Sequence, residues 1–375
     1  MAGLRFLHTA DVHLGAAFRF LGTRGKEQRA QLKSTFSRVV DLALTSEVDA
    51  VLIAGDLFET AYPHSALVGE VIYQLGRLNA EGIWIFIVPG THDRIVPGCV
   101  YESDDLAGLS HLHIFMDREM SPLYIEGLDL TVYGRATCAE HGDVLEGFHA
   151  HNGSRWRVGM LHASFFIPGK VEDDEMIVTE ESISSSGLDY LALGHWHDTA
   201  DYSRGGVPVF YSGSPESLEM GRGEVGKVVL VDLEEGCDAA VKYVPVGRRR
   251  LLRMELDAAD VGDPSQLYAV LRRKADQDLG LEVQVKNAWG EEWSECDWDG
   301  LEEELASLFF HLVLEPVPGG LTRQDVQAYP EKTVVGRFVR MASSEMSGLE
   351  GRDAKVAEEA LRLGLCYILG GSDAR

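Results

Sequence analysis

The sequence predicts an α/β protein, and two observations support this fold class. Over the first ninety residues, short apolar runs typical of buried strands alternate with segments of helical periodicity. Alternating strands and helices imply neighbouring strands that run parallel in one sheet. The chain also has 375 residues, more than one hydrophobic core usually supports, so we expect a large domain and smaller ones.

The elements of the large domain follow from the spacing of apolar residues. The first predicted elements alternate in order: strand 4–7, helix 26–47, strand 50–54, helix 63–78 and strand 83–88. Pro63 favours the start of the second helix, because proline fits the first turn. Five further candidates follow: a hairpin over 123–133 and strands 157–161, 188–193, 207–211 and 227–233.

The pattern of predicted elements changes after Val246. The elements predicted there are a strand 253–256, a helix 264–276, a strand 281–286 and an amphipathic helix 299–314. Residues 316–320 read as a linker, and the end of the chain is helix-like. We therefore expect three parts: a large domain over 1–247, a small α/β capping domain over 248–330, and a helical tail over 331–375.

Charge and cysteine content limit the function classes. The formal net charge of −26 argues against a protein that coats nucleic acid or an anionic membrane by itself. Five scattered cysteines without a CxxC pair indicate a reduced protein rather than a disulfide scaffold. Because no apolar stretch resembles a signal peptide or a membrane span, we expect a cytoplasmic protein without membrane association.

Polar residues cluster directly after the predicted strands, where open α/β sheets place their ligands. They are Asp11, His13, Asp56, His92, Asp93, His162, His195 and His197. Imidazole and carboxylate without thiolate suit Mn, Fe, Zn or Ni rather than a structural zinc cage. Their number fits two divalent ions that share a bridging carboxylate, about 3.5–4 Å apart.

Five ordered motifs resemble those of the calcineurin-like metallophosphoesterases. They are Asp11-x-His13, Gly55-Asp56, Gly90-Thr91-His92-Asp93, the lone His162 and Gly194-His195-Trp196-His197. The runs FLHTADVHLG (6–15), GDLF (55–58) and YSGSPE (211–216) resemble more narrowly the SbcD/YhaO-type branch. That resemblance implies a two-layered β-sandwich flanked by helices. It also implies a DNA exonuclease that works with an SMC-like ATPase of the SbcC type in double-strand-break repair.

The resemblance also assigns roles to the motif residues. It implies one metal on Asp11, His13 and His197, another on His162 and His195, and Asp56 as the bridge. His92 would protonate the leaving oxygen, and Asp93 would fix the tautomer of His92. The two ions, most simply Mn, would supply a hydroxide for in-line attack on a phosphodiester.

Thr91 departs from the family pattern, which has an asparagine ligand of the second metal at this position. A threonine hydroxyl is shorter and a poorer ligand, so the second ion would bind weakly, through water, or not at all. Two alternatives to a nuclease therefore stay open. One is a phosphoesterase for nucleotides or small diesters, and the other is a catalytically weakened scaffold that binds DNA ends or an ATPase.

Candidate substrate contacts lie near these motifs. Residues 19–38 carry six basic residues against one acid, and we expect phosphate contacts from Arg19 and Arg24, with an ordinary helix surface as the alternative. Glu59 is expected to face the substrate, and Ser214 to contact phosphate or to belong to a plain turn. The net negative charge predicts that a partner protein provides much of the affinity for DNA. The tail is the expected docking segment, and a homodimer is left open.

Overall fold

The computed structural model describes residues 3–137, 142–151, 153–171, 176–223, 225–288, 293, 296–317, 330 and 332–349, and some residues from 353 to 368. The chain divides into two compact units, Met1–Arg250 and Leu251–Arg375. The first boundary lies close to the expected one. A separate part over 331–375 stays a prediction.

The first unit contains a six-stranded sheet in the order β15-β14-β1-β2-β3-β4. Its strands are β1 (Leu4–Thr9), β2 (Ala50–Ala54), β3 (Trp84–Val88), β4 (Leu112–Ile114), β14 (Lys227–Leu233) and β15 (Ala240–Pro245). Strands β1 to β4 pair in parallel, as predicted, whereas β14 runs antiparallel to both of its neighbours.

A second six-stranded sheet has the order β12-β13-β11-β8-β6-β5. Its strands are β5 (Ser121–Ile125), β6 (Leu130–Gly134), β8 (Trp156–His162), β11 (Tyr190–Gly194), β12 (Ala200–Asp201) and β13 (Val209–Tyr211). The predicted hairpin is β5 and β6, joined by a 3-10 turn η3 (Glu126–Leu128). Strands β6, β8, β11 and β13 run parallel.

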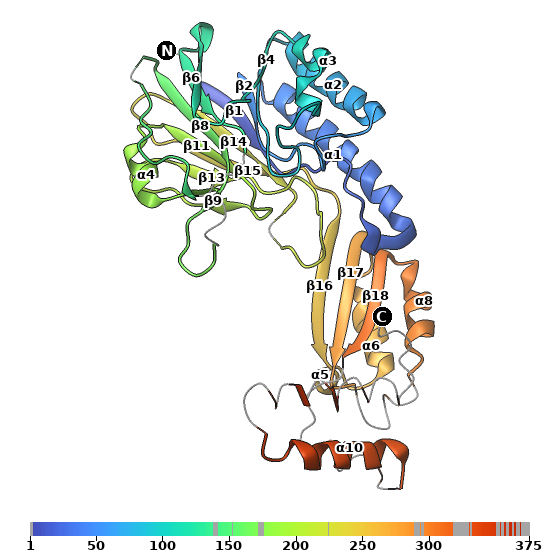
Figure 1. Cartoon of the computed structure of the whole chain (residues 1–375). Helices are drawn as coiled ribbons and strands as arrows, with labels where there is room; N and C mark the ends of the chain where they lie inside the picture. Colours follow the sequence, from blue (N-terminus) through green and yellow to red (C-terminus); the bar gives the residue numbers. More distant parts are fainter. Residues whose placement is uncertain are drawn as a thin grey trace. The chain divides into compact units, whose positions relative to one another are not determined.

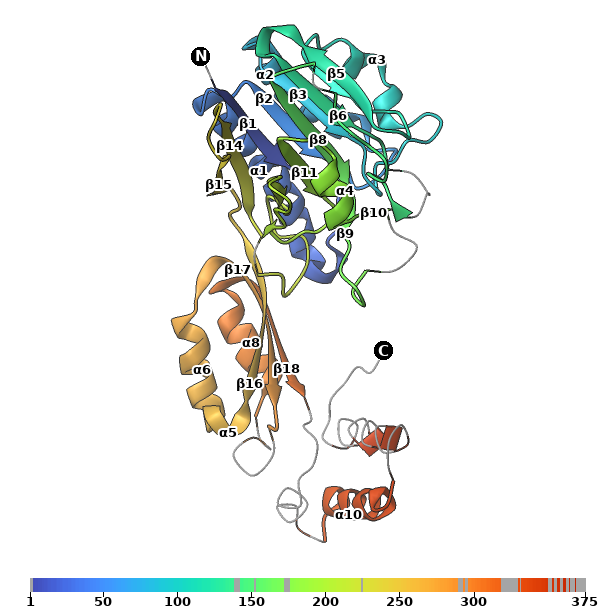
Figure 2. The same cartoon turned by 90° about the vertical axis from the view of Figure 1, so that its left-hand side faces the viewer.

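The two sheets pack face to face and form the core of the unit. Phe6, Leu52 and Phe86 from the first sheet are fully or almost fully buried against a cluster that includes Met160 and Tyr190 from the second. Figures 1 and 2 show the sheets as stacked layers, with α1 (Gly25–Thr45) and α2 (Ser65–Ala80) on the outer side of the first sheet. The predicted α/β class and its two layers are thus confirmed.

Short elements complete this unit. They are η1 (Arg19–Arg24), η2 (Val100–Glu102), α3 (Asp104–Ala107), β7 (Gly142–Asp143), β9 (Ser164–Phe165), β10 (Met176–Val178) and α4 (Glu180–Ser185). Phe165, Met176 and Ile183 from this set pack with Leu161 and Leu191 in a second core cluster.

The second unit is a three-stranded sheet in the order β16-β17-β18 with helices. Its elements are β16 (Arg250–Asp257), α5 (Ala258–Val261), α6 (Pro264–Arg273), β17 (Asp276–Lys286), α8 (Trp298–Ala306) and β18 (Phe309–Val317). Strands β17 and β18 run parallel, so β17-α8-β18 is a βαβ unit, with Leu267, Leu305 and Phe309 in its core.

The predicted helix over 299–314 is wrong in its second half. The helix ends at Ala306, and Phe309, Leu312 and Leu314 point into the core from strand β18. The aromatic and branched residues of this run satisfy strand and helix patterns alike, and pairing with β17 selects the strand. The predicted linker overlaps this strand at Pro316 and Val317, and its residues 318–320 lie outside the described ones.

One helix is described in the expected tail, α10 (Val334–Met346), and Thr333 caps it by accepting a hydrogen bond from the Gly336 backbone. Val339 is buried on its inner face, whereas Val334 and Met341 are exposed. No helix in the described part of the chain combines the length and apolar character that a membrane span requires.

A buried carboxylate ties the first helix to the end of the first unit. Glu216 is fully buried, and its Oε2 accepts hydrogen bonds from the Thr35 hydroxyl at 2.7 Å and from Gln31 at 3.2 Å. The same carboxylate accepts from the backbone N–H groups of Arg248 and Arg249 at 3.0 and 2.9 Å. It therefore joins α1, the loop after β13 and the segment that leaves the domain.

Glu216→Ala should destabilise the first unit by roughly 3 kcal/mol, because it leaves buried donors without an acceptor. Urea unfolding followed by circular dichroism measures the change, and the exposed Glu126→Ala is the matched control, expected within about 0.5 kcal/mol of the native chain. Equal stability of the two variants would contradict the role of this carboxylate.

Candidate metal centre

The candidate ligands come from the carboxyl ends of parallel strands in both sheets. Asp11 follows β1 and Asp56 follows β2 in the first sheet, whereas His162 ends β8 and His195 follows β11 in the second. The Asp11 carboxylate joins the sheets, because both of its oxygens accept from the His195 N–H at 3.1 Å. The two sheet edges therefore converge on one place.

Four candidate ligands have a left-handed backbone. The φ angles of Asp11, His13 and Asp56 are 52°, 50° and 50°, and that of His195 is 104°. Such angles are unfavourable for residues with a side chain and occur most often at functional sites. Backbone hydrogen bonds from Asp11 N to Gly55 O (3.1 Å) and from His13 N to Asp56 O (2.9 Å) hold these turns in place.

Asp56 lies at the centre of the cluster. Its Oδ2 is 3.3 Å from His162 Nε2 and 3.6 Å from His13 Nε2, so one oxygen faces an imidazole from each sheet. Its Oδ1 accepts a hydrogen bond from the His92 backbone at 2.8 Å. The side chains of Asp56, His13 and His162 are almost completely buried.

The donor atoms are arranged for cations. The Nε2 atoms of His13 and His162 are buried and make no hydrogen bond within the described residues. Their other ring nitrogens are occupied. His162 Nδ1 lies 3.0 Å from the Ala54 carbonyl, which can only accept a hydrogen bond, so in the neutral ring Nδ1 carries the hydrogen and Nε2 keeps its lone pair. Such fixing of the tautomer is typical of metal-binding histidines.

Three groups of donors have atoms that all lie within 4.8 Å of one another. They are Asp11-His13-His197, Asp11-Asp56-His162 and His13-Asp56-His92. The first matches the set expected for one metal, and the second contains Asp56 and His162 of the other. The ring of His195 packs edge-on against that of His162, with centroids 5.2 Å apart. The donor set thus fits two divalent cations that share Asp56.

The electrostatics of the cluster favour positive charge. Burial lowers the pKa of His162, but the facing carboxylates of Asp56 and Asp11 outweigh it and raise this pKa to about 9. Burial likewise opposes ionisation of Asp56, yet His162 and His13 hold the pKa of its carboxyl below the usual range. The two buried carboxylates, Asp11 and Asp56, are therefore stable only next to positive charge, supplied either by protonated imidazole rings or by metal ions.

Glu59 contacts two histidines of the candidate centre, and its expected contact with substrate stays a prediction. Its Oε2 lies 2.9 Å from His13 Nδ1, and its Oε1 lies 3.8 Å from His92 Nδ1. Burial lowers the pKa of His13, but the hydrogen bond to Glu59 and nearby carboxylates raise it above its usual value. Glu59 thus orients a candidate ligand and neighbours the candidate acid.

Thr91 and His92 are exposed beside this centre. The Thr91 hydroxyl donates to Asp56 Oδ2 at 3.3 Å, so threonine reaches the shared carboxylate where the family has asparagine. His92 Nδ1 is 3.3 Å from the Glu59 carbonyl, and one ring nitrogen of His92 lies within 4.8 Å of donor atoms of His13 and Asp56.

Asp93 does not fix the tautomer of His92, contrary to expectation. Asp93 is fully buried, and its carboxylate accepts from the backbone N–H groups of Gly90 (2.7 Å) and Phe58 (3.0 Å) and from the Tyr101 hydroxyl (2.5 Å). The Asp93 carboxylate therefore connects the loop after β2 to the loop after β3. Tyr101 was missed because its sequence position carries no motif.

Other expected substrate contacts also differ. Ser214 is fully buried, and its backbone N–H, the group expected to meet phosphate, donates to the His197 carbonyl at 2.8 Å. Its hydroxyl donates to the Asp11 carbonyl at 2.7 Å, so Ser214 braces the loop after β1. Arg24 pairs with Glu27 at 2.8 Å on the helix surface. Arg19 is exposed on η1, and its phosphate contact stays a prediction.

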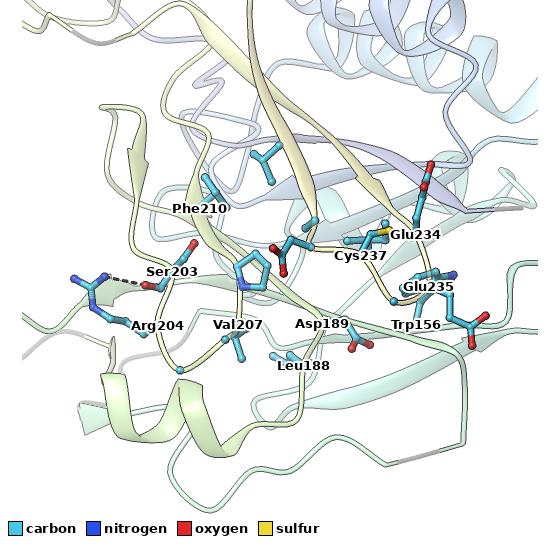
Figure 3. Close-up of a pocket in the computed structure, with 18 of the residues that line it drawn as sticks. Trp156, Leu188, Asp189, Ser203, Arg204, Val207, Phe210, Glu234, Glu235 and Cys237 are labelled. Carbon is cyan, nitrogen blue, oxygen red and sulfur yellow. Dashed lines mark hydrogen bonds between the residues drawn. The ribbon is translucent and has the colours of Figure 1, made fainter.

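A hollow of about 730 Å³ lies at the opposite edge of the sandwich, near the starts of β8 and β11 (Figure 3). Its charged rim is occupied by internal contacts: Arg155 pairs with Glu235 at 2.8 Å, and Arg204 donates to the Ser203 carbonyl at 2.8 Å. None of the candidate ligands lines this hollow.

The class of protein follows from comparison. Residues 4–199, more than half of the chain, match the calcineurin-like phosphoesterase family, and the chain belongs to this family. Members of the family use a two-metal site, and the chain holds candidate ligands for one.

Individual relatives are similar at moderate identity. The chain is 28% identical to the DNA double-strand break repair protein Mre11 of Methanopyrus kandleri, over 76% of this chain and 65% of that protein. It is 28% identical to the uncharacterized metallophosphoesterase YhaO of Bacillus subtilis, over 59% of this chain and 55% of that one. It is 25% identical to the SbcD component of the nuclease SbcCD from the same organism, over 76% and 80%. The match thus spans less than two thirds of the first two relatives.

Gly90→Ala should weaken metal binding at least tenfold. A methyl group there would lie 2.2 Å from Asp56 Oδ1 and 2.5 Å from the Asp56 backbone nitrogen, so the Asp56 carboxylate and its loop must move. Circular dichroism of the variant checks that the chain still folds. Isothermal titration with Mn²⁺ measures the affinity. Gly76→Ala on α2, where a methyl group meets nothing within 4 Å, is the control and should bind as the native chain does. Equal affinities in the two variants would refute Asp56 as a ligand.

Proposed function

We propose that this metallophosphoesterase is a Mn-dependent DNA nuclease, acting as an exonuclease on phosphodiester bonds. The observation that carries the proposal is the Asp56 carboxylate between His13 and His162, with the Nε2 atoms of both rings turned toward it. Asp11 and His197 extend the donors on one side, and His195 lies beside His162 on the other.

Two divalent ions at this centre would supply a hydroxide at neutral pH and neutralise charge on the phosphate. Asp56 would belong to the ligands of both ions, because its carboxylate faces the rings of His13 and His162. His92 is exposed beside them, and its imidazolium form could give the Nε2 proton to the leaving oxygen while Nδ1–H donates to the Glu59 carbonyl, which leaves a neutral ring. The Glu59 carboxylate is also nearby, with its Oε1 3.8 Å from His92 Nδ1.

Similarity to the Mre11 protein and to the SbcD component of SbcCD supports DNA as the substrate and DNA repair as the setting. With them we propose an SMC-like ATPase partner and a cytoplasmic location. A partner also agrees with the net charge of −26, because an acidic chain gains little affinity for DNA from its own surface. The exposed Val334 and Met341 of α10 are candidates for that contact.

Thr91 supports a second candidate, a weakened scaffold for DNA ends or an ATPase. Its hydroxyl donates to Asp56, whereas an asparagine carbonyl would offer a lone pair to a cation. This candidate predicts DNA binding without metal-dependent cleavage. The nuclease assay therefore distinguishes the two.

With Mn²⁺, the native chain should digest linear single-stranded or duplex DNA. Asp56→Ala should reduce digestion to background, and His92→Ala should lower kcat by about 10²- to 10³-fold through loss of the general acid. The readout is the release of acid-soluble nucleotides.

The control variant is His149→Ala, since His149 is an exposed histidine outside the centre and should not alter kcat. Unchanged kcat in His92→Ala would show the acid assignment to be wrong. Strong hydrolysis of a small diester without DNA cleavage would favour the small-molecule phosphoesterase.

A further inference from the structure

An exposed tyrosine stands next to the candidate centre. The side chain of Tyr62 is 62% exposed, and Tyr62 follows Glu59 by three residues in the loop after β2. Three residues span at most about 11 Å, so the backbone of Tyr62 lies within that distance of Glu59, which borders the centre. This aromatic residue has no part in the metal cluster or in the core.

The ring of Tyr62 is held although it is exposed. Its hydroxyl donates to the Pro97 carbonyl at 3.0 Å, and Pro97 belongs to the loop after β3 that also carries His92. The two loops are joined again by the Val100 N–H, which donates to the Ala61 carbonyl at 2.9 Å. Tyr62 thus bridges the two loops that supply Asp56 and His92, and an anchored ring loses little entropy on binding.

The loop that Tyr62 is bonded to also carries an exposed arginine, Arg94. Arg94 is exposed two residues after His92 and makes no ion pair or hydrogen bond with any other described residue. Arginine contacts phosphate through several N–H donors, and an anchored aromatic ring offers a face to a base. One loop pair therefore presents both kinds of contact that single-stranded nucleic acid requires.

We propose that Tyr62 and Arg94 form a subsite for an unpaired nucleotide next to the scissile phosphate, with the base on the Tyr62 ring and its phosphate on Arg94. The proposal rests on the proposed nuclease function and defines its substrate: a strand with an unstacked base, as in single-stranded DNA or a frayed end. In a closed duplex the base stacks on its neighbours and cannot reach the ring.

Tyr73 shows why exposure alone does not carry this inference. It is 68% exposed on α2, but no hydrogen bond within the described residues ties its hydroxyl to a loop of the centre. Single exposed aromatic residues are common on protein surfaces. Tyr62 differs because its hydroxyl bond fixes it between two site loops.

The test measures binding and cleavage separately. Binding of labelled single-stranded oligonucleotides is followed by fluorescence anisotropy in the Asp56→Ala background, which should not cleave them. Tyr62→Ala and Arg94→Ala should each raise Kd by about tenfold, within the range for loss of one stacked base or one phosphate contact. Tyr73→Ala is the control and should leave Kd unchanged.

A set of oligonucleotides that each carry one abasic residue identifies the stacked base. One position should raise Kd about tenfold with Tyr62 present and have no effect in Tyr62→Ala, because the ring has then lost its partner. In active chains with Mn²⁺, Tyr62→Ala should raise KM for intact oligonucleotides by a similar factor, with little change in kcat.

Equal Kd for Tyr62→Ala and Tyr73→Ala, or abasic effects that persist without the ring, would overturn the subsite even if DNA is cleaved. Tyr62-dependent binding without cleavage by the native chain would uphold the subsite and overturn the proposed nuclease. Absence of oligonucleotide binding would overturn the subsite, whereas absence of Mn²⁺-dependent cleavage by the native chain would overturn the proposed nuclease.

Discussion

The arrangement of the two sheets in the first unit depends on the contact of one carboxylate, that of Asp56, with two imidazole rings. Asp56 must face His13 from its own sheet and His162 from the other, so the carboxyl ends of both sheets must meet at one edge. Close approach is possible because Gly55 leaves room for the His162 ring; a methyl group there would lie 2.1 Å from its Nδ1. The packing of the two sheets, the missing side chain of Gly55 and the left-handed turns at the candidate ligands together allow the two sheet edges to meet.

The same contact explains how an acidic protein can act on an anionic substrate. Asp11 and Asp56 are buried without a lysine or arginine among the described groups that pair with them, and imidazoles are their counterparts. A buried carboxylate pair is stable only beside positive charge. The centre therefore attracts cations locally although the whole chain carries −26, and bound cations would in turn favour phosphate.

Much of this could be predicted from the sequence, because strand periodicity and the residues after each strand are local properties. Asp11, Asp56 and His162 were predicted at strand ends. Parallel pairing brings Asp11 and Asp56 to one edge of the first sheet, and the packing of the two sheets brings His162 to the same place. The contacts that orient them could not be predicted. The Tyr101–Asp93 bond and the hydrogen bond from Ser214 to the Asp11 carbonyl depend on loop paths that periodicity does not encode. The strand after Ala306 was missed for a related reason, since pairing with β17 decides between two patterns that the sequence satisfies equally.

The central claim is that Asp56 is shared by two cations. Anomalous diffraction from crystals soaked in Mn²⁺ tests it most directly, because each bound ion gives a separate peak. The account predicts two peaks about 3.5–4 Å apart on either side of the Asp56 carboxylate. A single peak that Asp56 does not contact, or no peak at this edge of the sandwich, would contradict it.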